Sequence, residues 1–286
     1  MTYCKKQCYS TFDISMKNGA KYSIEELSFD TLFNGRVVLY QPRKGYRFSV
    51  DSPLLTWFSG DDNRCADQCA DLGSGCGVIG ISLLVARMAR QVVGVEIQPQ
   101  LADLSEKNAR ANAVEDQLNV LNADITDLQC FLPSKQFDLV VSNPPFWPVD
   151  TGRLPPDEER RIARHEISIT LTALIRAAKR LLHPKRGRFC IAFPAIRLEM
   201  LFSAIAEAHL HTTRVVFVHP NPESPAELVL LEARSGRAGQ LKIAPPLYLK
   251  NSDNSNSEIA NDILSGTFCD SLRTLEDLRA VSRQAQ

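Results

Sequence analysis

The sequence predicts an α/β fold, in which an open, mostly parallel sheet is covered by helices on both faces. Three observations predict it. From about residue 65 onward, short apolar runs typical of buried strands alternate with segments of helical periodicity. A glycine-rich turn joins the first of these strands to the first helix. The last two strands are joined only by PNPESP, which is too short for a crossover helix and indicates an antiparallel hairpin at one edge of the sheet.

Seven segments are predicted as strands: CADQCADL, QVVGVE, QLNVLNA, FDLVVSN, RFCIAF, RVVFVH and AELVLLEA. The first is unusually polar for a buried strand, because Asp67 and Gln68 stand where aliphatic side chains are common. Pro99 suits the first turn of a helix, where its missing N–H needs no partner. Helices are predicted at Val78–Ala89, Pro99–Ala113, Ile167–Leu182 and Ala195–Ala208.

The chain divides into three parts on this pattern. Residues 1–60 form a small β/α extension, and residues 61–250 form the α/β domain itself. Residues 251–286 hold an Asn/Ser-rich polar loop and a helical tail, whose last twenty residues are expected either to form a helix around Leu272–Ser282 or to remain mobile. No internal repeat is found.

Composition describes an ordinary globular protein of 286 residues, 44% of them hydrophobic. The 33 basic and 33 acidic residues cancel, so the chain as a whole exerts no attraction on nucleic acid, and any basic surface is local. No apolar segment reaches the length that spans a bilayer, and the first residues lack the apolar core of a signal peptide. We therefore expect a cytoplasmic protein without a membrane partner. Among the eight cysteines there is no CxxC pair, so no metal site is expected.

The glycine-rich turn DLGSGCGVIG has the geometry of a nucleotide site. Gly73, Gly75 and Gly77 allow a tight turn and a close approach of ligand to backbone, with a helix N-terminus behind it. Glu96 ends the next strand about twenty residues on, where an acid that binds ribose is expected. Nicotinamide and S-adenosylmethionine sites share this geometry, so the turn alone does not separate them.

Three further features favour the methyl donor. Asp71 stands two residues before the first glycine, where a carboxylate can meet the donor's aminoacyl end. Asp124 follows the third strand, where it can accept from the amino group of the donor's adenine. Each acid taken singly could be an ordinary loop or cap carboxylate, an interpretation that is less plausible for the coordinated set. The third feature is NPPF at the end of the fourth strand, for which a dinucleotide oxidoreductase has no evident use.

The NPPF segment concentrates hydrogen-bond acceptors at the carboxyl edge of the sheet. Asn143 offers an amide oxygen, and the Pro144 carbonyl offers a second acceptor. Pro144 and Pro145 stiffen the backbone and remove two N–H donors. This arrangement suits a planar –NH2 group, whose two hydrogens it can hold, while Phe146 provides a face on which a base can stack.

With these motifs the chain resembles the class I S-adenosylmethionine-dependent methyltransferases that act on planar nitrogens. More narrowly, it resembles the tRNA(Val) (adenine-N6) methyltransferases, which modify the adenine just 3′ of the anticodon. The similarity covers most of the chain and is carried by QPRKGYRFSVDSPLL, DLGSGCGVIG, NPPF, ARHE and VHPNPESPAELVLLEA through PPLYL.

The resemblance implies a Rossmann-like class I fold, S-adenosylmethionine as donor, S-adenosylhomocysteine as product, no metal, and methyl transfer to an adenine N6 in tRNA. A monomer or weak homodimer is expected, with the extension at residues 1–60 packed on the donor site. Phe146 and Arg164 are expected at the substrate. The implied donor contacts are Asp51, Asp71, Gly73, Gly75, Gly77, Glu96, Asp124 and Asn143.

A local basic segment supports an RNA partner. Residues 151–190 contain ten Lys or Arg and four acids, so their net charge is +6 (10 − 4). Part of this segment could contact RNA phosphates beside the site. The segment PRKGYR, residues 42–47, adds basic and aromatic groups that could also meet nucleic acid. A solvated charged surface is the simpler interpretation of any single arginine here.

Alternatives remain open on the sequence alone. NPPF serves equally for a protein glutamine N5, a guanine N2 of rRNA or an adenine N6 of DNA. A non-catalytic RNA-binding subunit with a methyltransferase fold is a rival of another class, although the intact glycines, Glu96 and Asn143 argue against it. A nicotinamide-dependent dehydrogenase ranks last.

Overall fold

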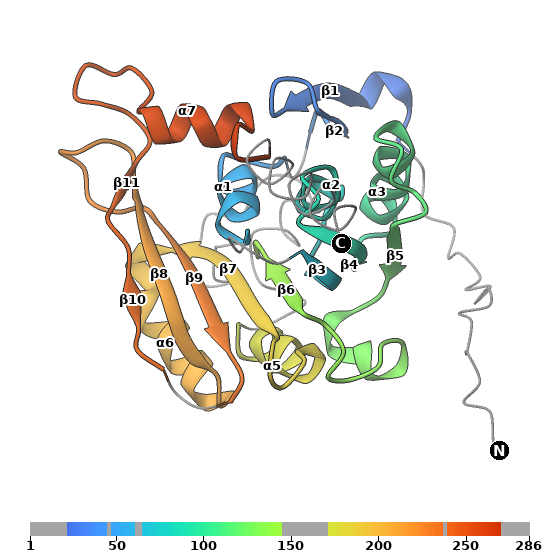
Figure 1. The fold of residues 1–286 in the computed structure, drawn as a ribbon. Helices are drawn as coiled ribbons and strands as arrows, with labels where there is room; N and C mark the ends of the chain where they lie inside the picture. Colours follow the sequence, from blue (N-terminus) through green and yellow to red (C-terminus); the bar gives the residue numbers. More distant parts are fainter. Residues whose placement is uncertain (1–21, 45–46, 61–64, 145–170, 237–238, 270–286) are drawn as a thin grey trace, which may run out of the picture.

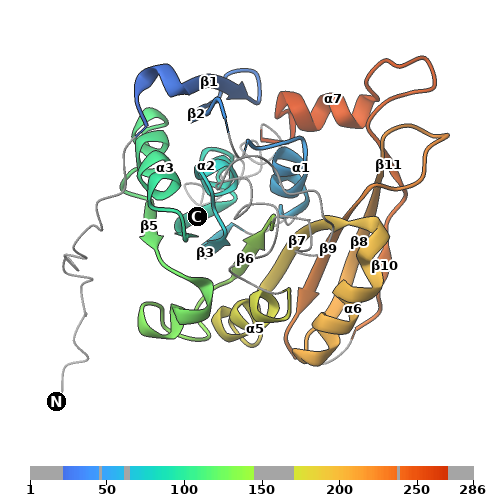
Figure 2. The same ribbon diagram turned by 180° about the vertical axis from the view of Figure 1, so that it is seen from behind.

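The computed structural model of the protein describes residues 22–44, 47–60, 65–144, 171–236 and 239–269 (Figure 1). A large mixed sheet runs through the molecule, and helices cover both of its faces, as Figures 1 and 2 show from opposite sides. In the described part of the chain, no helix is both long enough and apolar enough to cross a membrane.

The sheet contains all seven predicted strands, in the order β8-β9-β7-β6-β3-β4-β5. Every strand is parallel to its neighbours except β9, which is antiparallel to both β7 and β8. The strands are β3 (Ala66–Leu72), β4 (Ala89–Glu96), β5 (Leu118–Asn122), β6 (Leu139–Ser142), β7 (Arg188–Pro194), β8 (His211–His219) and β9 (Leu228–Arg234). The fold class predicted from the sequence is confirmed.

Two further strands were not predicted. β10 (Lys242–Ile243) and β11 (Leu247–Tyr248) are two residues long and pair in parallel with β8. The β8–β9 hairpin is therefore not the outermost element, because these short segments cover the edge that β8 would otherwise expose. Their shortness and the prolines between them hide them from a search for apolar runs.

Two apolar cores flank the sheet. On one face α1 (Asp51–Phe58), α2 (Val78–Val85) and α3 (Pro99–Ala111) pack together with the N-terminal ribbon. On the other face lie α5 (Leu171–Leu181) and α6 (Leu198–Glu207), together with two short 3-10 helices, η2 (Ile125–Cys130) and η3 (Ala195–Arg197). α2 ends four residues earlier than predicted, because Arg87 adopts φ 58° and Ala89 already belongs to β4.

The two polar residues that are unusual for a buried strand, Asp67 and Gln68, lie near the amino end of β3. Asp67 and Gln68 are exposed, whereas the four residues after them are buried. Asp138 accepts hydrogen bonds from the backbone N–H groups of Asp67 (3.0 Å) and Gln68 (3.3 Å), and Arg90 pairs with Asp67 at 3.1 Å. The strand therefore packs normally where it approaches the glycine turn.

The N-terminal part comprises η1 (Ile24–Glu26) and an antiparallel ribbon of β1 (Leu27–Leu32) and β2 (Val37–Pro42), followed by α1. A segment far away in sequence closes over it: α7 (Glu258–Ser265) contacts α1. Phe33 and Phe268 pack edge to face at 5.4 Å, and Arg36 donates to the Gly266 carbonyl at 3.3 Å. The predicted helix at Leu272–Ser282 lies outside the described residues.

Buried charges anchor the C-terminal end of α1. Arg188 of β7 donates to the Ser59 carbonyl at 2.9 Å, and Arg214 of β8 donates to the Phe58 carbonyl. Glu232 of β9 lies between the two arginines, at 3.5 and 3.4 Å. Both arginines lie toward the amino ends of their strands, so the N-terminus of α1, which carries Asp51, points to the carboxyl edge of the sheet.

Candidate functional site

Three of the predicted site residues form a row at the carboxyl edge of the sheet. Asp71 of β3 pairs with Val141 of β6, so Asn143 stands level with Gly73, two residues farther along. Leu72 pairs with Val95 of β4, which brings Glu96 to the same level on the other side. Ligands bind at this edge in parallel α/β sheets. The topology therefore gathers these residues as the sequence predicted.

The glycine turn adopts backbone angles that are unfavourable for residues with a side chain. Gly73, Gly75 and Gly77 have φ angles of 74°, 57° and 87°, in the left-handed region that favours glycine. The N–H groups of Gly73 and Ser74 both donate to the Val95 carbonyl, at 2.9 and 3.0 Å. These bonds hold the turn against the end of β4, next to Glu96.

Glu96 binds the turn directly. It is buried, and its Oε2 accepts from the Gly75 N–H at 2.8 Å while its Oε1 accepts from the Gln98 N–H at 2.9 Å. Burial raises the pKa of Glu96, against the effect of these N–H donors. The carboxylate therefore shapes the glycine turn as well as lying where a ribose is expected.

Asp71 has a buried carboxyl group, and one of its two oxygens accepts a hydrogen bond. Its Oδ2 accepts from the Gly80 N–H in the first turn of α2, at 3.0 Å. Burial raises the pKa of Asp71 from 3.8 to about 7, the Gly80 N–H opposes this rise, and the charge of Glu96 adds to it. A cation placed beside Asp71 would restore its ionised form.

Several buried polar atoms around the turn are unsatisfied. Among the described residues, Asp71 Oδ1, Ser74 Oγ and Asn143 Oδ1 have no hydrogen-bond partner. A Cβ added to Gly73 would meet no atom within 4 Å, so open space lies beside it. Buried polar groups are normally paired, and here a nearby glycine leaves room for a partner. The residues present therefore fit a ligand that has both donors and a cationic group, as an aminoacyl sulfonium donor has.

The end of β6 is fixed by its own side chains. Ser142 is buried and donates from Oγ to the Leu72 carbonyl at 2.7 Å, which joins β6 to β3 just before Asn143. Asn143 is 8% exposed, and Pro144 is also buried. Pro145, Phe146 and Arg164 lie outside the described residues, so their predicted roles stay predictions.

Asp124 and Asp51 occupy positions near this edge. Asp124 follows β5 and caps η2, with Oδ1 accepting from the N–H and the hydroxyl of Thr126, both at 2.8 Å. Its cap role agrees with the simpler of the two interpretations and leaves the contact with the donor's adenine a prediction. Burial raises the pKa of Asp51, Ser49 lowers it, and the charge of Glu227 raises it further.

The described half of the basic segment does not lie beside the site. Lys179 donates to His209 and Ser235, and Arg180 donates to the Leu132 carbonyl. Arg186 pairs with Asp138, and Arg188 with Glu232, at the amino edge of the sheet. The contacts of these four side chains are within the protein, and the expectation that another part of the segment follows phosphates stays a prediction. Residues 151–170, with the other arginines, lie outside the described part.

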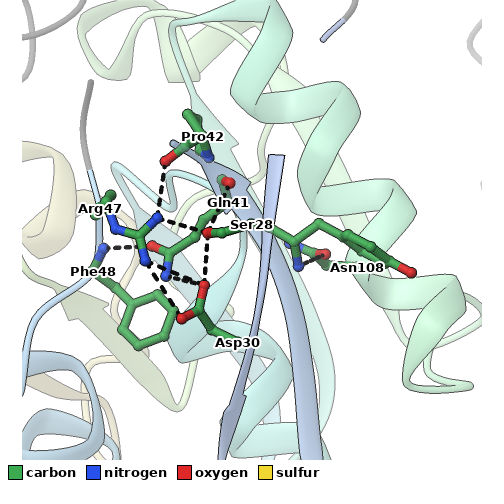
Figure 3. Close-up of polar contacts among 8 residues, drawn as sticks. Ser28, Asp30, Gln41, Pro42, Arg47, Phe48 and Asn108 are labelled. Carbon is green, nitrogen blue, oxygen red and sulfur yellow. Dashed lines mark hydrogen bonds and ion pairs between the residues drawn. The ribbon is translucent and has the colours of Figure 1, made fainter. Parts of the chain in front are cut away.

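The segment PRKGYR is also used internally. Arg47 donates to Ser28 at 2.6 Å and to the Pro42 carbonyl at 3.2 Å, and it pairs with Asp30 (Figure 3). Gln41 bridges Asp30 and the Phe48 N–H, at 2.8 and 3.2 Å. Arg47 therefore fastens the segment before α1 to the ribbon, and a contact of PRKGYR with nucleic acid stays a prediction.

Sequence reasoning missed Ser74 and Ser142. Ser74 lies within the glycine turn and Ser142 directly precedes Asn143, and both are buried. A small polar residue inside an otherwise apolar strand end is the signal that could have singled out Ser142.

The sheet topology, the glycine turn and the position of Asn143 at the carboxyl edge of the sheet define a class I methyltransferase. Residues 54–154 match the family model of the methyltransferase small domain. A predicted O-methyltransferase from Agrobacterium tumefaciens shares the fold, with a TM-score of 0.59, 23% identity and coverage of 76% of this chain and 96% of that one.

Two curated relatives narrow the family. A tRNA1(Val) (adenine(37)-N6)-methyltransferase from Porphyromonas gingivalis is 33% identical over 192 residues, which cover 66% of this chain and 74% of the relative. One of the same name from Phocaeicola vulgatus is 30% identical over 193 residues, covering 68% and 79%. The chain belongs to the family of tRNA1(Val) (adenine(37)-N6)-methyltransferases.

Proposed function

We propose that the protein transfers a methyl group from S-adenosylmethionine to the exocyclic N6 of an adenine in tRNA, next to the anticodon. The observation that carries this proposal is the buried Asn143 Oδ1 at the carboxyl edge, level with the glycine turn, which has no hydrogen-bond partner within the described residues. Family membership supports the RNA substrate, because the relatives are named for that adenine. A cytoplasmic enzyme that acts as a monomer or weak homodimer, without metal, is part of the proposal.

The donor would lie along the row at the carboxyl edge. Asp71 Oδ1 would pair with the donor's ammonium group, and Glu96 would accept from the ribose hydroxyls. Asp124 would accept from the adenine amino group, and Asp51 would stand near the methionine end. Gly73 leaves the space that such a ligand needs. When bound, S-adenosylmethionine supplies an electrophilic methyl group on its sulfonium sulfur.

The target amine would be held by acceptors alone. Asn143 Oδ1 and the Pro144 carbonyl would each accept one hydrogen of the –NH2 group, which turns the nitrogen lone pair away from both acceptors and toward the methyl group. Positive charge develops on this nitrogen, and the two oxygens stabilise it in a site shielded from water. No strong base is needed, since the nitrogen becomes acidic only after transfer. Phe146 would stack on the extruded base.

Labelled donor tests the substrate. We would incubate the protein with methyl-labelled S-adenosylmethionine and separate pools of tRNA, rRNA, DNA and protein. Label is expected in tRNA alone. Label confined to protein or DNA would contradict the substrate proposal, and label in rRNA would favour guanine N2 as the target.

Asn143→Ala tests the mechanism in the same assay. Because orientation of the amine is the main task of Asn143, transfer should fall at least about a thousandfold, while the donor Kd stays within about tenfold. Calorimetry with S-adenosylhomocysteine gives the Kd. Unimpaired turnover in this variant would refute the role of Asn143.

A further inference from the structure

Asn108 is a buried amide within α3 that touches both the N-terminal ribbon and the glycine turn. It is fully buried, although asparagine is a poor residue for a helix interior. Its Oδ1 accepts from the Tyr40 N–H at 2.7 Å, and its Nδ2 donates to the Tyr40 carbonyl at 2.9 Å. The same Nδ2 donates to the Cys76 carbonyl at 2.9 Å. The side chain uses three of its bonding positions on backbone groups of two separate segments.

Asn112 repeats half of this arrangement one helical turn later. Its Oδ1 accepts from the Val38 N–H at 2.9 Å, and its Nδ2 donates to the Val38 carbonyl at 2.6 Å. Four residues of helix advance about 6 Å and two residues of strand about 6.6 Å, so this spacing matches Val38 and Tyr40. The two asparagines thus satisfy the open edge of β2 (Figure 3 shows Asn108 beside it). Asn112 has no contact with the turn among its hydrogen bonds within the described residues.

The glycine turn is unusually close to α3. A Cβ on Gly77 would lie 2.3 Å from Ser105 Oγ, three residues before Asn108 on the same helix face. The Cys76 carbonyl lies just before α2, and the Gly80 N–H four residues later donates to Asp71. Asn108 thus supplies a donor to a carbonyl at the helix start, where the regular bonding pattern is interrupted.

We propose that Asn108 is a positioning residue for donor binding, which holds the glycine turn in its binding conformation and couples it to the N-terminal ribbon. The inference rests on the proposed use of the turn for S-adenosylmethionine. The turn is held from the β4 side by Glu96 and from the α3 side by Asn108. Loss of the second hold lets Cys76 and its neighbouring glycines relax, at a cost to donor affinity.

The test compares Asn108→Ala with Asn112→Ala as its matched control. Both variants lose two bonds to β2, but only Asn108→Ala loses the bond to Cys76. Calorimetry with S-adenosylhomocysteine should show the Kd rising about tenfold or more for Asn108→Ala and less than about threefold for Asn112→Ala. The donor KM should follow the Kd, with kcat within about threefold of the wild type. Equal Kd values for the two variants would overturn the proposal.

Hydrogen exchange separates the two proposals. Amides of residues 75–77 should exchange faster in the Asn108 variant than in the Asn112 variant, without any ligand present. If the wild type binds no S-adenosylhomocysteine, the proposed function fails, but exchange still tests the hold on the turn. Unchanged exchange would refute that hold.

Should Asn108→Ala fail to fold, Asn108→Asp keeps the volume and the acceptor for Tyr40 but removes the amide donor. It should weaken donor binding equally at pH 8, and wild-type affinity in it would contradict the proposal.

Discussion

Single side chains at the carboxyl edge carry the proposed chemistry of donor binding. Asp71, Ser74 and Asn143 each bury an oxygen without a partner among the described residues. Leaving a buried polar group unpaired costs about 1–3 kcal/mol. Three such atoms around one glycine turn are best explained by a ligand that pairs with them.

We expect Asp71 to make the affinity for the donor depend on pH. With a folded-state pKa near 7, against 3.8 ordinarily, it is largely protonated below neutral pH. Because the ammonium group of the donor needs the carboxylate, the Kd of S-adenosylhomocysteine should increase as the pH falls below 7, by up to about tenfold per pH unit. Calorimetry between about pH 5.5 and 7.5 measures this.

The same shift affects the stability of the ligand-free protein. A raised carboxyl pKa means that the contribution of Asp71 to stability is fully present below pH 3.8 and is lost as the pH rises through about 7. Asp71→Asn should abolish this part of the dependence and give weak, pH-independent donor binding. A Kd in Asp71→Asn that still follows pH would assign the titration to Glu96, whose pKa is also raised.

Alanine substitutions at three glycines with positive φ distinguish effects on ligand binding from effects on stability. Gly35, Gly73 and Gly77 have φ values of 82°, 74° and 87°. Alanine at each should cost about 1–2 kcal/mol of unfolding free energy through its backbone conformation. Gly77→Ala should cost more, because its Cβ would meet Ser105.

Donor binding distinguishes the two open positions. Gly73→Ala should raise the donor Kd about tenfold or more, because the methyl group would occupy the space beside the turn. Gly35→Ala, in the β1–β2 turn with equally open surroundings, should leave the Kd unchanged. Urea unfolding and calorimetry give both quantities, and equal Kd values for these two variants would place the ligand elsewhere.

At the scale of the elements, periodicity predicted the strands and turn chemistry indicated the candidate site, but side-chain bonds between elements could not be predicted. NPPF and the glycine turn were found because the hydrogen-bonding groups of the first and the backbone freedom of the second can be recognised from residue types alone. β10 and β11 were missed because two-residue strands have no period. The internal use of Arg47 was missed because its partner Asp30 is known only after the ribbon folds. The same reason hides the bond between Asn108 and Cys76, two residues 32 positions apart.

The anchor of α1 predicts a strong effect of one buried charge. Burial raises the pKa of Glu232, but bonds from Arg234 and Thr213 and the nearby arginine charges lower it overall. Glu232→Gln removes the buried carboxylate that pairs with Arg188 and should cost about 3–5 kcal/mol of unfolding free energy. Urea unfolding measures this. The control is Glu106→Gln on α3, whose 44% exposed side chain pairs with Arg110, and it is expected to cost less than about 0.5 kcal/mol.

The pH dependence of the anchor gives a second check. A lowered carboxyl pKa contributes stability that is present above pH 4.5 and is lost as the pH falls through the folded-state pKa. The difference in unfolding free energy between wild type and Glu232→Gln should therefore shrink below pH 4.5. A constant difference would mean that the carboxylate is not what holds the arginines.

At the scale of the whole molecule, segments from both ends of the described chain assemble on one face of the sheet. The ribbon binds α3 through the two asparagines, α7 closes on the ribbon and α1, and α1 carries Asp51 to the carboxyl edge. This assembly is consistent with the proposal that the segment QPRKGYRFSVDSPLL lies near the donor. The sequence indicated the extension, and only the structure shows which bonds hold it.

The identity of the methylated nucleoside tests the central claim most directly. Purified protein would be incubated with S-adenosylmethionine and tRNA that lacks this modification, and the digested nucleosides would be analysed by mass spectrometry. The account predicts N6-methyladenosine with the wild type, and none with Asn143→Ala. A methylated guanosine, or unmodified tRNA from a protein that binds the donor normally, would contradict it.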